Sequence, residues 1–182
     1  ICLQAGKLSV AARGLVAARA CLENHDKPGL LAYLWTRPRT ASNVARIAEL
    51  CWQLQDELGF ARLAAVLPSQ PADRQLASAW LYVGTWQQQH QQLEEARASL
   101  RQAKLLAPGN TEVALSQGWL ALALQDKKAA RAILDEHQQQ PASDAWAPLL
   151  GSLAQFLGDH RQAYFYFRYM AKRHPKDLAN LV

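Results

Sequence analysis

Small residues and helix-stopping prolines recur along this chain at intervals of 33 or 34 residues, and no other feature constrains its fold as strongly. Gly84, Gly118 and Gly151 define the two intervals. The same spacing separates three further sets of residues: Ala96, Ala130 and Ala163; Leu100, Leu134 and Phe167; Pro108, Pro141 and Pro175. A period of this length indicates one structural unit repeated in tandem, in which each unit buries its apolar face against its neighbours.

The composition indicates that the repeated unit is helical. Half of the 182 residues are hydrophobic, which is enough to bury a sizeable core. Alanine, leucine and glutamine dominate, whereas the β-branched residues typical of strands are few outside short patches. We therefore expect an all-α fold.

One unit carries the fullest pattern, and its residues are Trp80, Val83 and Gly84, followed by Ala96, Leu100, Ala103 and Pro108. They resemble the tetratricopeptide (TPR) pattern W-x2-L-G, A-x3-F and a closing proline. The stretch LGDHRQA at 157–163 is similar to the turn between the two helices of that family. The resemblance implies a right-handed superhelical solenoid of antiparallel helix pairs.

The spacing predicts about five helix pairs in a single TPR array over residues 1–182. Their expected ranges are 6–38, 41–71, 74–108, 111–141 and 143–175, with 176–182 starting another helix. The first two units depart from the pattern, because Ala48 replaces the glycine and the second helices near 28–36 and 58–67 are short. Since the chain begins at Ile1 and ends inside a predicted helix, we expect it to be part of a longer polypeptide.

The sequence contains no recognisable catalytic or metal-binding motif. There is no GxGxxG, GxxxxGK or HExxH, so we predict a non-enzyme without cofactor or metal. Cys2, Cys21 and Cys51 lie far apart among apolar residues and are predicted to be buried free thiols. His90 lies in a glutamine-rich stretch that we interpret as a polar loop. The net charge of +5 is spread along the chain, which argues against nucleic acid as a partner.

Three large apolar residues, Trp52, Trp119 and Phe156, fall where the TPR resemblance implies the concave, solvent-facing groove. Exposed aromatic residues of this kind often anchor protein interfaces, so we predict that they bind a partner. Two alternatives stay open: the superhelix buries them against the adjoining repeat, or a polysaccharide stacks on their rings.

The stretch AYFYFRYMA at 163–171 divides into two faces when a helix is wound at about 100° per residue. The predicted core arc holds Ala163, Tyr164, Phe167, Met170 and Ala171. The predicted outward arc holds Arg161, Phe165, Arg168, Tyr169 and Lys172, with Tyr166 and Arg173 at its edge. This outward pairing of rings and cations fits an acidic protein partner, packing against a neighbouring repeat, or a sugar.

The repeats and the segment FRYMAKRHPKDLANL resemble the periplasmic arrays of bacterial outer-membrane exopolysaccharide exporters, in particular the Pel (PelB-like) type. That resemblance implies a scaffold that docks polymer-modifying enzymes, a deacetylase or hydrolase, during export and biofilm formation. It also implies a periplasmic location within an outer-membrane protein. A cytoplasmic regulatory or chaperone-type TPR adaptor and a direct polysaccharide-binding protein are the alternative functions.

Overall fold

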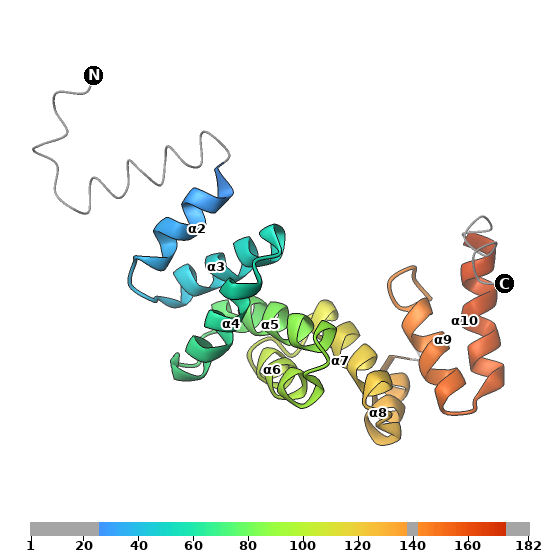
Figure 1. Cartoon of the computed structure of the whole chain (residues 1–182). Helices are drawn as coiled ribbons and strands as arrows, with labels where there is room; N and C mark the ends of the chain where they lie inside the picture. Colours follow the sequence, from blue (N-terminus) through green and yellow to red (C-terminus); the bar gives the residue numbers. More distant parts are fainter. Residues whose placement is uncertain (1–25, 138–141, 174–182) are drawn as a thin grey trace, which may run out of the picture.

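The computed structural model describes residues 26–137 and 142–173, and every regular element in these ranges is helical. Antiparallel helices follow one another along an elongated array, with α2 at one end and α10 at the other (Figure 1). The α-helices are α2 (Lys27–Trp35), α3 (Ala41–Leu54), α4 (Glu57–Val66), α5 (Ala77–Gln89), α6 (Leu93–Leu106), α7 (Thr111–Ala123), α8 (Lys127–His137), α9 (Ala147–Phe156) and α10 (His160–Arg173). The protein is therefore an all-α helical-repeat solenoid, as predicted.

Successive helices pair as α3 with α4, α5 with α6, α7 with α8 and α9 with α10. Each of the last four predicted ranges contains one such pair, while α2 lies at the end of the range 6–38. The rest of that first range, and the predicted start of another helix at 176–182, lie outside the described residues.

The same tight turn joins the two helices of every pair. In each turn one residue has a positive φ angle, in the left-handed region; these residues are Gln55, Gln91, Gln125 and Gly158. In three of the four turns the next residue is an aspartate, whose carboxylate accepts a hydrogen bond from an amide in the first turn of the second helix. Such capping satisfies amides that would otherwise lack a partner at a helix start. The glutamines thus take the conformation that glycine adopts most easily.

The apolar core is divided into three clusters that follow the chain. The first extends from α2 to α5, the second joins α5, α6 and α7, and the third extends from α7 to α10. Helix α5 contributes to the first two clusters through Val83 and Leu81, and α7 contributes to the last two through Leu120 and Ala121. Burial between neighbours is what a solenoid uses in place of one central core.

The periodic glycines allow close helix packing, but they do not all face the same partner. A Cβ at Gly84 would lie 2.8 Å from Leu100 Cγ, on the second helix of the same pair. A Cβ at Gly118 would instead meet Leu149 of the following pair. In the α3–α4 pair, where Ala48 stands in place of the glycine, Gly59 on the second helix provides the space and lies against Cys51.

The predicted division of α10 into core and outward residues is wrong at two positions. Tyr164, expected in the core, is 65% exposed, whereas Tyr166, expected at the edge of the outward arc, is only 3% exposed. Phe167 packs against Gly151 but is 37% exposed. Earlier pairs explain both errors, because Arg97 and Arg131, one residue after the periodic alanine like Tyr164, are exposed, and Ser99 and Ile133 are buried like Tyr166.

The glutamine-rich stretch around His90 is also more ordered than the predicted polar loop. Helix α5 continues to Gln89, and the buried Gln87 side chain accepts a 2.7 Å hydrogen bond from the Ser99 hydroxyl. The His90 ring lies 3.1 Å from a Glu57 carboxylate oxygen, which also accepts a hydrogen bond from the Trp86 indole. Polar side chains therefore tie α5 to both α4 and α6.

Cys51 is a buried free thiol, as predicted, whereas Cys2 and Cys21 lie outside the described residues. Burial, and to a smaller extent the nearby Asp56 carboxylate, raise the pKa of Cys51 to about 12. The thiol therefore stays protonated and unreactive near neutral pH. Among the described helices, none combines the length and apolar character needed to cross a membrane.

Candidate protein-binding surface

Trp52 is half-buried at the junction between two repeats. Its ring stacks on Tyr82 of α5 with centroids 5.4 Å apart, and it meets Phe60 edge-to-face at 6.2 Å. These contacts correspond to the packing alternative, in which the adjoining repeat covers the ring. They account for the presence of Trp52 without a bound partner.

The other two predicted groove aromatics differ from each other in exposure. Trp119 on α7 is 41% exposed. Phe156, at the end of α9, is half-buried and packs against the third apolar cluster. The structure thus does not gather Trp52, Trp119 and Phe156 into one site, and Trp119 offers the most accessible ring of the three.

The outward arc predicted on α10 forms one continuous surface, which we call the α10 outer band: Arg161, Phe165, Arg168, Tyr169 and Lys172. Four of these side chains are exposed and Tyr169 is half-buried. Shallow hollows lie on either side of Phe165. One includes Arg161 and the other includes Arg168, Tyr169 and Lys172. The Phe165 ring, 60% exposed, therefore stands between two recesses, each of which includes a cation and one of which also includes Asp159.

Packing beneath the band supports its two rings. The Phe165 ring meets the buried Tyr166 ring edge-to-face, with centroids 5.2 Å apart. The Tyr169 hydroxyl donates a 3.3 Å hydrogen bond to Asp144, which precedes α9 and also binds the Arg173 guanidinium at 3.3 Å. Burial raises the pKa of Tyr166, so its phenol remains neutral beneath the band. A supported, exposed ring loses less entropy on binding than a free one.

The band carries a strong local positive charge. The sequence of α10 contains no acidic residue. Within the described part of the chain, Arg161, Arg168 and Lys172 form no ion pair, unlike Arg173. Unpaired cations beside an exposed ring attract an acidic surface and provide an apolar contact at its centre. In the described ranges, no group of three or more potential ligands could hold a metal ion.

Sequence reasoning missed a pocket elsewhere on the array, between α6, α7 and α8. Its residues come from three helices, and most are alanines, leucines or ordinary surface charges that attract no attention in the sequence. A signal was nevertheless present, since Ala129 and Ala132 leave one side of α8 without bulky side chains.

Comparison with known proteins agrees with the repeat architecture. A family model described as tetratricopeptide repeat matches residues 15–182. The crystal structure of a thermophilic TPR protein from Thermus thermophilus is similar, with a TM-score of 0.52 and 16% sequence identity, and the match covers 92% of this chain and 93% of the other. At this identity the likeness concerns the fold alone. A search of curated proteins found no match.

Proposed function

The chain belongs to the tetratricopeptide-repeat family, a premise from which we propose that it is a non-catalytic scaffold that docks an acidic protein surface on the α10 outer band. TPR arrays generally bind protein partners, because stacked helix pairs offer an extended surface. The observation that carries the choice of surface is the exposed Phe165 ring among three cations that lack ion pairs within the described residues.

The charge of the band favours a protein partner over the other options for this surface. Arg161, Arg168 and Lys172 provide complementarity to carboxylates, which speeds association and excludes basic partners. A sugar would gain from the two rings but little from the three cations. Packing against another repeat would leave these cations to be buried without partners, which is unfavourable.

Binding to a purified candidate tests this proposal. We suggest replacing Phe165→Ala, Arg168→Glu and Lys172→Glu together and measuring the affinity by biolayer interferometry. The expected loss is about tenfold or more at physiological salt, because the central ring and two attractive charges are removed. A matched control, Lys127→Glu with Lys128→Glu, reverses two exposed charges on α8 and is expected to bind normally. Equal binding by the triple variant and the wild type would remove the band as the docking surface.

The finer proposal is that the partner is a periplasmic polysaccharide deacetylase or hydrolase in Pel-type exopolysaccharide export. Its support is the resemblance of the repeats and of FRYMAKRHPKDLANL to such export arrays. Under this proposal the intact protein carries a secretion signal and fractionates with the outer membrane. Fractionation of the native protein to the cytoplasm would favour the regulatory adaptor instead.

Direct polysaccharide binding is a second candidate, favoured by the exposed indole of Trp119. Carbohydrate stacking on this ring would change its fluorescence. Titration with exopolysaccharide fragments, comparing wild type with Trp119→Phe, separates this candidate from docking at the band. A saturable change that Trp119→Phe abolishes would support carbohydrate binding.

A further inference from the structure

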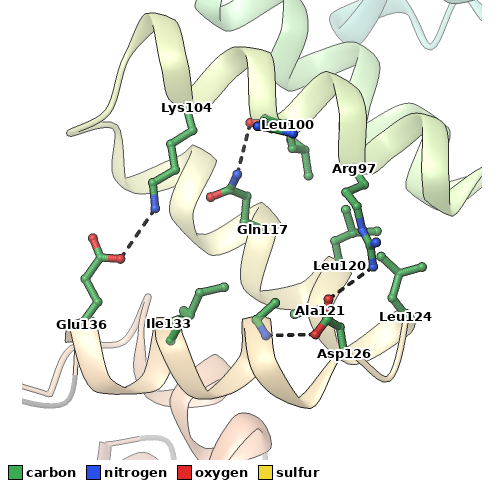
Figure 2. Close-up of a pocket in the computed structure, with 13 residues that line it drawn as sticks. Arg97, Leu100, Lys104, Gln117, Leu120, Ala121, Leu124, Asp126, Ile133 and Glu136 are labelled. Carbon is green, nitrogen blue, oxygen red and sulfur yellow. Dashed lines mark hydrogen bonds and ion pairs between the residues drawn. The ribbon is translucent and has the colours of Figure 1, made fainter.

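A cavity of about 370 Å³ lies between the second helices α6 and α8, with α7 beneath it (Figure 2). Its wall is mainly apolar and comprises Leu100, Leu120, Ala121, Leu124 and Ile133. The Gln117 amide, which also lines the cavity, donates a 3.3 Å hydrogen bond to the Leu100 carbonyl. The cavity thus offers an apolar interior in which this amide is already hydrogen-bonded.

Two ion pairs cross the cavity between α6 and α8. Arg97 lies 3.3 Å from Asp126, and Lys104 lies 3.6 Å from Glu136 (Figure 2). The helix spacing puts Arg101 between Arg97 and Lys104 on the α6 rim. The two ion pairs thus lie on either side of Arg101 and hold α6 beside α8.

Among the described residues, Arg101 is the unpaired charge of this rim. It lines the cavity, is exposed, and makes no ion pair or hydrogen bond within the described ranges. Between Asp126 and Glu136, the cavity lining from α8 consists of Ala129, Ala132 and Ile133. Arg101 therefore places a positive charge beside an apolar recess. Between the two ion pairs, no acidic residue of α8 lines the cavity.

The recess exists because α8 packs its apolar side elsewhere. Leu134 belongs to the third cluster, together with Leu149 and Leu150 of α9. Gly118 of α7 likewise faces Leu149 and not a residue of α8. With this attachment to α9 and only alanines at 129 and 132, α8 does not fill the space beside α6.

We propose that this cavity docks an acidic segment of a partner protein, with a large apolar side chain in the recess and an adjacent carboxylate bound by Arg101. The volume lies near the lower end of the roughly 300–1,000 Å³ range of ligand pockets, which suits a side chain better than a long acyl chain. Arg101 supplies the charge complementarity, since arginine binds carboxylates bidentately. The proposal uses other residues than the α10 outer band and does not depend on it.

Methyl NMR of the full chain provides a direct test. The sequence has three isoleucines, Ile1, Ile47 and Ile133, of which Ile133 lines the cavity and Ile47 is buried in the first cluster. The probe is a synthetic peptide with a central Leu-Glu pair in a Gly/Ser frame. We expect it to shift the Ile133 methyl signal and leave that of Ile47 unchanged. Leu-Gln and Ala-Glu versions are expected to bind about fivefold or more weakly.

Two pairs of variants separate the charge from the recess. Arg101→Glu should weaken the Leu-Glu peptide about tenfold, while Arg131→Glu, an equal charge change outside the cavity lining, should leave binding unchanged. Ala132→Trp should fill the recess and block binding, whereas Ala98→Trp on the exposed side of α6 should not.

Three results would overturn the proposal. The Ile133 signal does not respond to the Leu-Glu peptide up to about 5 mM, a concentration at which weak sites still bind. Arg101→Glu binds the peptide as well as the wild type does. Sodium decanoate shifts Ile133 while all three peptides fail, which would assign the cavity to a small amphiphile.

Discussion

Aromatic side chains gather at two places in this array, and their surroundings differ completely. Between the α3–α4 and α5–α6 pairs, Trp52 stacks on Tyr82 and Phe60 stacks on Trp86, while Trp52 meets Phe60 edge-to-face. On α10, Tyr164 and Phe165 are mostly exposed to solvent. The same residue class therefore joins neighbouring repeats at one place and forms an accessible surface at the other. Aromatic content by itself does not identify a binding surface.

The largest expected contrast in stability is between Phe60 and Phe165. Phe60 is 2% exposed and stacks on Trp86 at 5.6 Å, so Phe60→Ala should lower the free energy of unfolding by about 4 kcal/mol. Phe165→Ala removes an exposed ring and should change it by less than about 0.5 kcal/mol. Urea unfolding followed by circular dichroism measures both. A loss of several kcal/mol for Phe165→Ala would make that ring part of the core and break the comparison.

A second contrast lies within α10 itself, between Tyr166 and Tyr164. Tyr166→Ala opens a cavity in the third cluster and should cost about 3 kcal/mol, whereas Tyr164→Ala should be nearly neutral. Thermal melting of the two variants provides the measurement. If Tyr164→Ala proved the more harmful, the original sequence-based assignment of the core arc would be correct after all.

Cys51 provides a smaller, pH-dependent contrast, because it lies in the same apolar cluster as Phe60. Its pKa rises from 9.0 to about 12 on folding. Between these pH values the unfolded chain loses the Cys51 thiol proton more readily than the folded chain does. The stabilisation that the protonated thiol contributes is therefore complete below pH 9 and is lost as pH rises towards 12. At pH 10 the expected loss is about 1.4 kcal/mol.

Urea unfolding at pH 8 and pH 10 measures this loss, in a background with Cys2→Ser and Cys21→Ser. Cys51→Ala should be less stable than this background at both pH values. Its free energy of unfolding should lack the part of the decrease between pH 8 and pH 10 that the thiol contributes. An identical pH dependence in the presence and absence of Cys51 would argue that its thiol titrates alike in the folded and unfolded chains.

The smallest effect concerns the hydrogen bond between Tyr169 of α10 and Asp144, which precedes α9. Tyr169→Phe removes the hydroxyl that donates to Asp144 but keeps the ring, so stability should fall by only about 0.5 kcal/mol. Partner binding should persist if the ring is what the partner contacts. Differential scanning fluorimetry measures this loss of stability. Arg161→Gln is the companion variant, because it removes a positive charge from the band and keeps the bond between Tyr169 and Asp144.

Much of the fold was predictable because the spacing of small residues directly records how close two helices come. Gly84 and Gly151 lie against the second helices of their own pairs, as their period indicated. The assignment of faces on α10 was less successful, because the predicted arc was not centred on the buried i, i+3, i+4, i+7 stripe that Ala96, Ser99, Leu100 and Ala103 form on α6. Aligning α10 with α6 and α8 by their periodic alanines would have identified Tyr166 as buried.

The contacts that the sequence did not reveal join residues brought together by stacking. Glu57 and His90 are far apart in sequence and meet only because α4 lies beside the end of α5. The stack of Trp52 on Tyr82 arises in the same way. The α10 outer band could be listed from helix geometry, but the support of Phe165 by Tyr166 could not.

The three apolar clusters, joined through α5 and α7, also determine how the array would respond to mechanical force. The first and last described helices lie at opposite ends of an elongated molecule (Figure 1). Tension applied there would be carried by each cluster in series, because the main contacts among the described helices join elements that are near neighbours along the chain. Such a chain would extend in successive steps as individual helix pairs detach, yielding gradually where a globular domain would rupture at once.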